Sequence, residues 1–266
     1  MKKNIIVLLV TLFGFSNVAF SAACGTSGAK TVFPSGDDYA NGCSAEPDYF
    51  ELKIYDMMLC TSAPTAPTSS ATAVTTSCQT VVTSASGSSV SVVKGSNAEL
   101  GGVITRPANG TYTHAYIRIS NDFIIKDSRQ FSTDDINDGT NKGDWCATTS
   151  SGVDCETSEV TAVKRTIALK DFTGGGVYSL EDISTSEGTL NAYLVDSAEL
   201  LGEGTYANTV YLVGTQVFTT PVVITDASTT MNASFGTTTG ITIFDDGGDE
   251  KIEIVSGPFS LKLTVE

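Results

Sequence analysis

The chain has 266 residues, of which 41% are hydrophobic, and this is enough for a packed core in one large or two small domains. Fifteen basic residues stand against 30 acidic ones. This balance excludes nucleic acid as an expected partner, because phosphate contacts need a basic surface. The single histidine excludes a histidine-rich metal site.

Residues 1–23 have the order of a secretory signal peptide. Lys2 and Lys3 precede an apolar run over residues 5–15, and small residues follow up to Ala23. The apolar run is shorter than the roughly 20 residues that span a bilayer. We therefore expect an exported mature protein without a transmembrane span, located outside the cell or at the cell surface. The periplasm and a lipid-anchored envelope position are the alternatives.

The six cysteines all follow the predicted signal peptide, and six can pair completely in an oxidising compartment. Loop-closure entropy favours bridges between neighbours along the chain. The predicted pairs are Cys24 with Cys43, Cys60 with Cys78, and Cys146 with Cys155. Lipidation of Cys24 is the alternative that would leave one of the other cysteines unpaired. The cysteine spacings are too wide for a zinc site.

Short segments with an apolar period of two recur along the chain, and this period is typical of half-buried strands. Turn-forming Gly, Asn, Asp and Pro residues separate these segments, and the best helical candidate is only the short stretch 196–201. The pattern predicts an all-β fold with little helix, an antiparallel β-sandwich with disulfide-stapled loops. The expected strands are 50–54, 89–92, 111–119, 123–125, 166–169, 190–195, 209–213, 222–224, 251–255 and 259–265.

The chain divides into two β-rich regions, residues 24–152 and 153–266, which form two small sandwiches or one large one. The first region contains a Ser/Thr-dominated stretch, residues 61–97, in which Lys94 is the only charged residue. Its first half carries Pro64 and Pro67, so we expect an extended loop closed by the Cys60–Cys78 bridge. Such a loop is a solvated connection of small polar residues or, alternatively, an O-glycosylated or adhesive tip.

A candidate binding face lies on the expected strand 111–119. Alternation places Tyr112, His114 and Tyr116 on one side of this strand, opposite Ala115 and Ile117. Tyrosine rings can stack on a sugar ring or a partner's side chain. The alternative is an aromatic pair between neighbouring strands on an exposed sheet. A nucleophile with a base cannot be assigned from one histidine, and no GxSxG motif is present.

Two acidic clusters, residues 134–139 and 245–250, raise calcium as a candidate ligand. The first cluster has Ile136 where an EF-hand loop needs an oxygen ligand. The second has Gly247 and Gly248 between two expected strands, which a hairpin turn requires without any metal. We therefore expect no obligatory cofactor, with calcium as the alternative.

These features predict a non-catalytic cell-surface or extracellular protein with a structural or adhesive role, self-associating or meeting a surface partner through its sheet edges. A binding module for a glycan or small ligand, with or without calcium, is the second hypothesis. A carboxylate-based glycoside hydrolase is the third. Among 30 acidic residues some pair will always have a suitable separation, so their number gives this hypothesis no weight.

Overall fold

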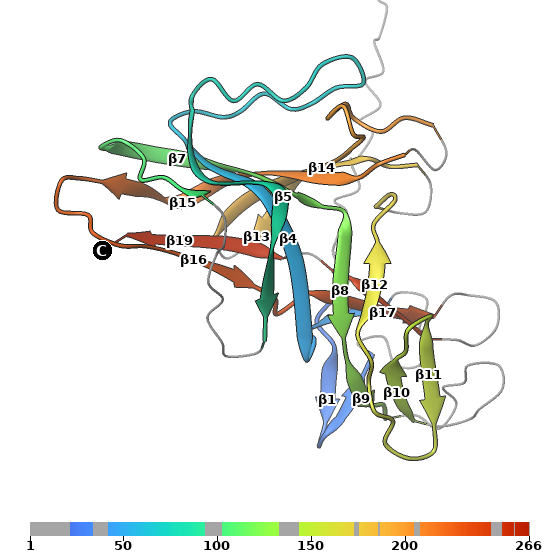
Figure 1. Ribbon diagram of the computed structural model, residues 1–266. Helices are drawn as coiled ribbons and strands as arrows, with labels where there is room; N and C mark the ends of the chain where they lie inside the picture. Colours follow the sequence, from blue (N-terminus) through green and yellow to red (C-terminus); the bar gives the residue numbers. More distant parts are fainter. Residues whose placement is uncertain are drawn as a thin grey trace, which may run out of the picture.

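The computed structural model describes residues 22–33, 42–93, 103–132, 144–172, 176–185, 187–204, 208–245, 252–257 and 259–265 (Figure 1). Nearly all of the predicted signal peptide, the acidic cluster 134–139 and most of the cluster 245–250 lie outside these ranges. Every regular element in the described part of the chain is a strand, and all strand pairs are antiparallel. The predicted all-β antiparallel fold is confirmed. In these ranges the structure has no helix that would be long and apolar enough to cross a membrane.

Nine strands form the large sheet of the molecule. They are β4 (Tyr49–Cys60), β5 (Cys78–Val92), β6 (Val103–Ile104), β7 (Gly110–Ser120), β8 (Asp122–Lys126), β12 (Arg165–Ala168), β13 (Ser179–Thr185), β14 (Gly188–Val195) and β15 (Tyr211–Ile224). The described residues also form four smaller sheets. Two of them have two strands each, β1 (Gly25–Ser27) with β2 (Lys30–Val32), and β16 (Met231–Gly236) with β19 (Ser260–Val265). The other two have three strands each, β9 (Ser128–Gln130) with β10 (Trp145–Thr148) and β11 (Val153–Glu156), and β3 (Cys43–Ala45) with β17 (Ile241–Asp245) and β18 (Ile252–Ser256).

The large sheet forks at Asn121, which separates β7 from β8. Both strands pair with the same side of β4, β7 with its second half and β8 with its first. The Asn121 side chain is buried, and its Nδ2 donates to the backbone oxygens of Leu169 at 3.0 Å and Thr209 at 2.8 Å. Leu169 follows β12, which pairs with β8, whereas Thr209 precedes β15, which pairs with β7. Asn121 therefore ties the two branches of the sheet together.

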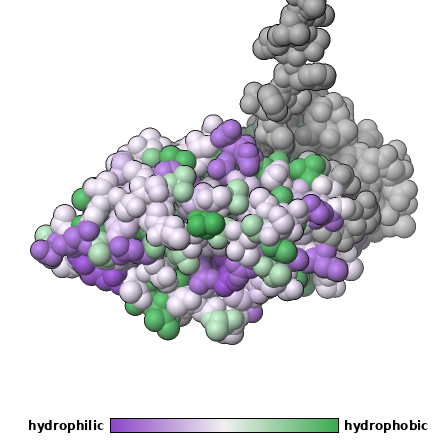
Figure 2. All heavy atoms as spheres, turned by 90° about the horizontal axis from the view of Figure 1, so that it is seen from above, coloured by the Kyte–Doolittle hydropathy of each residue, from purple (hydrophilic) through white to green (hydrophobic). Residues whose placement is uncertain are grey.

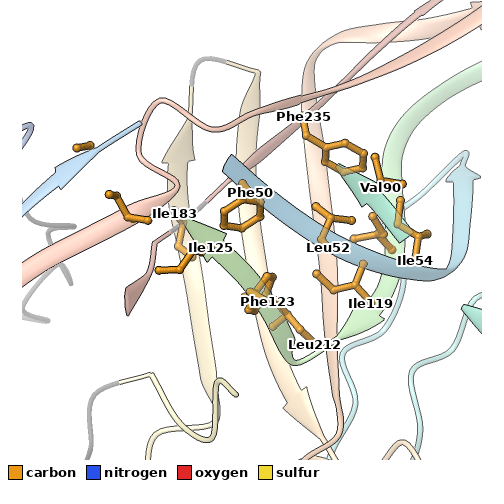
Figure 3. Close-up of a cluster of buried hydrophobic side chains, with 14 of the residues drawn as sticks. Phe50, Leu52, Ile54, Val90, Ile119, Phe123, Ile125, Ile183, Leu212 and Phe235 are labelled. Carbon is orange, nitrogen blue, oxygen red and sulfur yellow. The ribbon is translucent and has the colours of Figure 1, made fainter. Parts of the chain in front are cut away.

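The main core lies between the large sheet and the smaller sheets that cover one of its faces. Phe50, Leu52 and Ile54 of β4 alternate into it and are at most 1% exposed (Figure 3). Phe235 of β16 and the buried isoleucines of β17 and β18 belong to the same cluster. Figure 1 shows β16 and β19 next to the part of the large sheet that contains β7 and β15. The two layers form a β-sandwich, in which each buried large apolar side chain contributes roughly 1.5–3 kcal/mol.

All three predicted disulfide bridges are present: Cys24–Cys43, Cys60–Cys78 and Cys146–Cys155. The bridged residues are 19, 18 and 9 positions apart, so each bridge closes a local loop. The predicted boundary between residues 152 and 153 falls in the turn between β10 and β11. The third bridge links these two strands. Strands from both sides of that boundary share the large sheet and the main core.

Candidate functional site

A second, smaller apolar cluster lies on the face of the large sheet opposite the main core, which we call the outer face. Its buried members are Cys60, Tyr116, Tyr193, Val195 and Val213. Successive residues of a strand point to opposite faces, and the neighbours of these residues in the chain, including Leu59, Ala115 and Leu194, belong to the main core. The outer face is therefore partly apolar and needs a cover of its own.

The loop 61–77 between β4 and β5 provides that cover, and Figure 1 shows it arching above β7. The Cys60–Cys78 bridge closes the loop at its base. Within the loop, the amides of Thr65 and Val74 each donate to the other's backbone oxygen, at 3.1 and 3.2 Å. Ala66 and Ala73 pack against the outer cluster. The loop is consequently held as a small hairpin against the sheet.

The surface of this loop is neutral and rich in hydroxyl groups. No residue between 61 and 77 is charged, although the whole chain carries a net charge of −15. Figure 2 looks at the molecule from above and shows broad pale areas of intermediate hydropathy between separate hydrophilic and hydrophobic groups. The exposed hydroxyl residues of the loop are Thr61, Ser62, Thr65, Thr68, Ser69, Ser70, Thr72 and Thr76.

We predicted that Tyr112, His114 and Tyr116 share one face of the sheet. For Tyr112 this prediction is wrong. This tyrosine is 1% exposed and belongs to the main core, where its hydroxyl donates to the Ala108 backbone oxygen at 2.8 Å. Tyr116 is 4% exposed and lies in the outer cluster. The pairing of β7 with β15 is irregular at this point, because the register shifts between the pairs Val217–His114 and Val222–Tyr112.

His114 is half-buried beside Thr113, whose hydroxyl lies 2.8 Å from the imidazole Nδ1. Burial lowers the pKa of His114. The imidazole is therefore uncharged at neutral pH and can exchange hydrogen bonds with a neutral partner. Ligand binding by Tyr112, His114 and Tyr116 stays a prediction.

An ionic and aromatic cluster that we did not predict surrounds Arg118 on the outer face. The guanidinium donates from Nη2 to Asp56 of β4 and from Nη1 to Glu199. It also lies over the rings of Tyr55 and Tyr211, with its central carbon 5.7 and 5.2 Å from the ring centroids. All five side chains are half-buried. The sequence marks Arg118 as an outward residue of its strand, but nothing in it connects Arg118 to positions more than 60 residues away.

The turn 196–201 between β14 and β15 places Glu199 in this cluster. Asp196 accepts the backbone amides of Ala198 at 2.8 Å and Leu200 at 3.0 Å on its Oδ1. Glu199 adopts a left-handed backbone conformation with φ of 63°. A residue with a Cβ pays roughly 1–2 kcal/mol for this conformation. The side-chain bonds of Asp196 and the ion pair with Arg118 offset that strain.

Two tyrosines of the outer cluster have strongly raised pKa values. Burial raises the pKa of Tyr116 to about 12, with the charge of Glu199 acting in the same direction. Burial likewise raises the pKa of Tyr193 to about 12, and Glu181, which accepts the Tyr193 hydroxyl at 3.1 Å, adds to the effect.

These shifts predict a late step in an absorbance titration of the tyrosines. Tyr116 and Tyr193 should ionise near pH 12, against the ordinary value of 10.0. Because the folded-state pKa exceeds the unfolded one, stability should fall as the pH rises between these values. Tyr116→Phe and Tyr193→Phe should each remove part of the late step, whereas Tyr55→Phe should leave it intact. Burial also raises the pKa of Tyr112, so a smaller late step can remain in the Tyr116→Phe, Tyr193→Phe double variant. A late step of undiminished size in that variant would contradict the assignment.

No family model, no curated protein and no solved structure matches this chain. Within the described ranges, no group of three or more His, Cys, Asp or Glu side chains is arranged to hold a metal ion. The outer face is therefore the candidate site on its own geometry. It combines a fixed neutral loop with the Arg118 cluster beside it.

Proposed function

We propose that the protein is an exported, non-catalytic surface protein that adheres to neutral, hydroxyl-rich material through the loop 61–77. The observation that carries the proposal is the fixed hairpin form of this loop, whose exposed residues are rich in hydroxyl groups. A preorganised loop loses little conformational entropy on contact, so weak hydrogen bonds add up to net binding. The three bridges support export, since disulfides are typical of oxidising compartments.

Charge supports the choice of a neutral target. The acidic molecule is repelled by anionic surfaces, whereas the loop has no charge of its own. A sugar polymer without ionised groups can approach this loop without electrostatic cost. Its hydroxyl groups can then both donate and accept hydrogen bonds with Ser and Thr.

Adsorption of the mature protein to a cellulose film, followed on a microbalance, tests the proposal. The wild-type protein should adsorb reversibly, and Ser69→Glu with Thr72→Glu should weaken adsorption by about tenfold, because two carboxylates would have to be desolvated at the contact. The matched control is Ser150→Glu with Ser151→Glu, in the exposed β10–β11 turn, which is also closed by a bridge. Equal adsorption of both double variants, or none by the wild type, would refute the adhesive loop.

A further inference from the structure

Within the described residues the large sheet has three end strands, the two-residue β6, β12 and β13, and the last two each have a free edge. In the part of the chain that the structure describes, β12 pairs only with β8, and β13 pairs only with β14. An unpaired edge exposes backbone amides and carbonyls that can pair with another strand. Proteins usually protect such edges with charged residues, short strands or bulges.

The two edges carry opposite charges. Lys164 and Lys170 flank β12 and are both exposed, and Arg165 begins the strand. Nζ of Lys164 lies 3.7 Å from the ring centroid of Tyr49, and Nζ of Lys170 lies 3.5 Å from the Thr209 backbone oxygen. Two acids, Asp122 opposite Ala168 and Asp171 next to Lys170, offset part of the positive charge. The basic edge is unusual because the chain has only 15 basic residues among 266.

On β13, the register shifts between Leu180 and Ile183, and the two acids within this irregularity, Glu181 and Asp182, are exposed. Glu181 also accepts the hydroxyl of Tyr193 on β14 at 3.1 Å. No residue of β13 or β14 is basic. Each edge also has an exposed valine next to it, Val163 at 49% before β12 and Val177 at 37% before β13. The two edges thus combine opposite charge with a small apolar contact.

We propose that the protein assembles head to tail, with the basic β12 edge of one copy docked on the acidic β13 edge of the next. Pairing of two β12 edges would bring lysines together, and pairing of two β13 edges would bring carboxylates together, so repulsion disfavours both. Only the unlike edges attract each other. Such a contact joins different surfaces of the two copies, and it gives open chains when the rotation between them does not close a ring.

The contact is small, because β12 has 4 residues and the bulge interrupts β13. Interfaces of this size are weak and transient. We therefore expect reversible association that grows with protein concentration and weakens with salt, since the charges are exposed and screened. This assembly does not depend on what the loop 61–77 binds.

Sedimentation velocity of the mature protein tests the assembly, over concentrations from about 1 µM to about 1 mM, the range of weak complexes. The weight-average sedimentation coefficient of the wild type should rise with concentration at low salt. The basic-edge variant Lys164→Glu, Lys170→Glu should weaken association by about tenfold or more, because unlike charges become like ones. The acidic-edge variant Glu181→Lys, Asp182→Asn should do the same, and asparagine is chosen because Asp182 has a φ of 58°.

The variant that combines all four substitutions has its edge charges exchanged, so it should associate again. A general loss of folding would not be rescued in this way, and equal thermal unfolding of the variants checks it directly. The charge control is Asp226→Lys, in the exposed turn after β15, which should associate at least as well as the wild type. A wild type that stays monomeric at every concentration overturns the proposal, as does a combined variant that stays monomeric while the wild type associates.

Discussion

Replacing Arg118 with methionine is expected to lower the free energy of unfolding by about 3 kcal/mol. The guanidinium bonds two carboxylates, Asp56 and Glu199, whose side chains are 15% and 33% exposed, and its removal leaves them close together without a counter-charge. Its stacking on Tyr55 and Tyr211 is lost as well. Urea unfolding measures the change as a shift of the transition midpoint at constant slope.

Two further variants separate the ionic effect from lost packing. Arg118→Met combined with Asp56→Asn and Glu199→Gln removes the carboxylates too, and it should recover a large part of the loss. Arg165→Met, at the start of β12, should change stability by less than about 0.5 kcal/mol, as is usual for surface positions. A loss below about 1 kcal/mol for Arg118→Met would mean that the cluster behaves as an exposed ion pair screened by solvent.

Removing the Cys60–Cys78 bridge by replacing both cysteines with serine should lower the free energy of unfolding by roughly 3 kcal/mol, the loop-closure entropy for this chain separation. The loop 61–77 should also loosen from the outer face. Hydrogen exchange at the amides of Thr65 and Val74, each of which donates to the other residue's backbone oxygen across the loop, reports this directly.

Replacing Cys146 and Cys155 with serine is the matched control. This bridge closes a shorter stretch, 9 positions apart, and lies in the β10–β11 hairpin. Its loss should lower global stability by a similar amount but leave the relative exchange rates within the loop 61–77 unchanged. Unaltered exchange at Thr65 and Val74 in the Cys60→Ser, Cys78→Ser variant would show that the sheet contacts of the loop suffice to hold it.

Local sequence signals predicted the three bridges and most strands of the large sheet, but they missed β13, β16 and the short strands β1, β2, β3, β6, β9, β10 and β11. The alternation in β4 and the spacing of the cysteines are local patterns. They can therefore be read from the sequence without knowledge of the tertiary structure. The same logic failed at Tyr112, which lies in the main core although alternation places it on the face of His114. The register between β7 and β15 shifts between these two residues, and alternation holds only along a regular strand.

The candidate site depended even more on distant contacts. Pro64, Pro67 and the flanking cysteines identified the loop 61–77 in the sequence. The loop packs on an outer cluster with residues from β7, β14 and β15, and the sequence does not show that these strands lie side by side. The hydrogen bonds of Asn121 and Arg118 join residues that are 48 to 88 positions apart. Asparagine and arginine are common on strand surfaces, and only their burial distinguishes these two.

The order of the three bridges along the chain bears on how the protein matures. Each cysteine pairs with the next one in sequence, and no bridge encloses or overlaps another. A chain that crosses a membrane from its N-terminus delivers both partners of one pair before the first cysteine of the next pair emerges. For an exported chain, as we propose this one to be, an oxidant acting during translocation would generate the native set directly. The slow thiol–disulfide exchange that repairs wrong pairings would then be needed less.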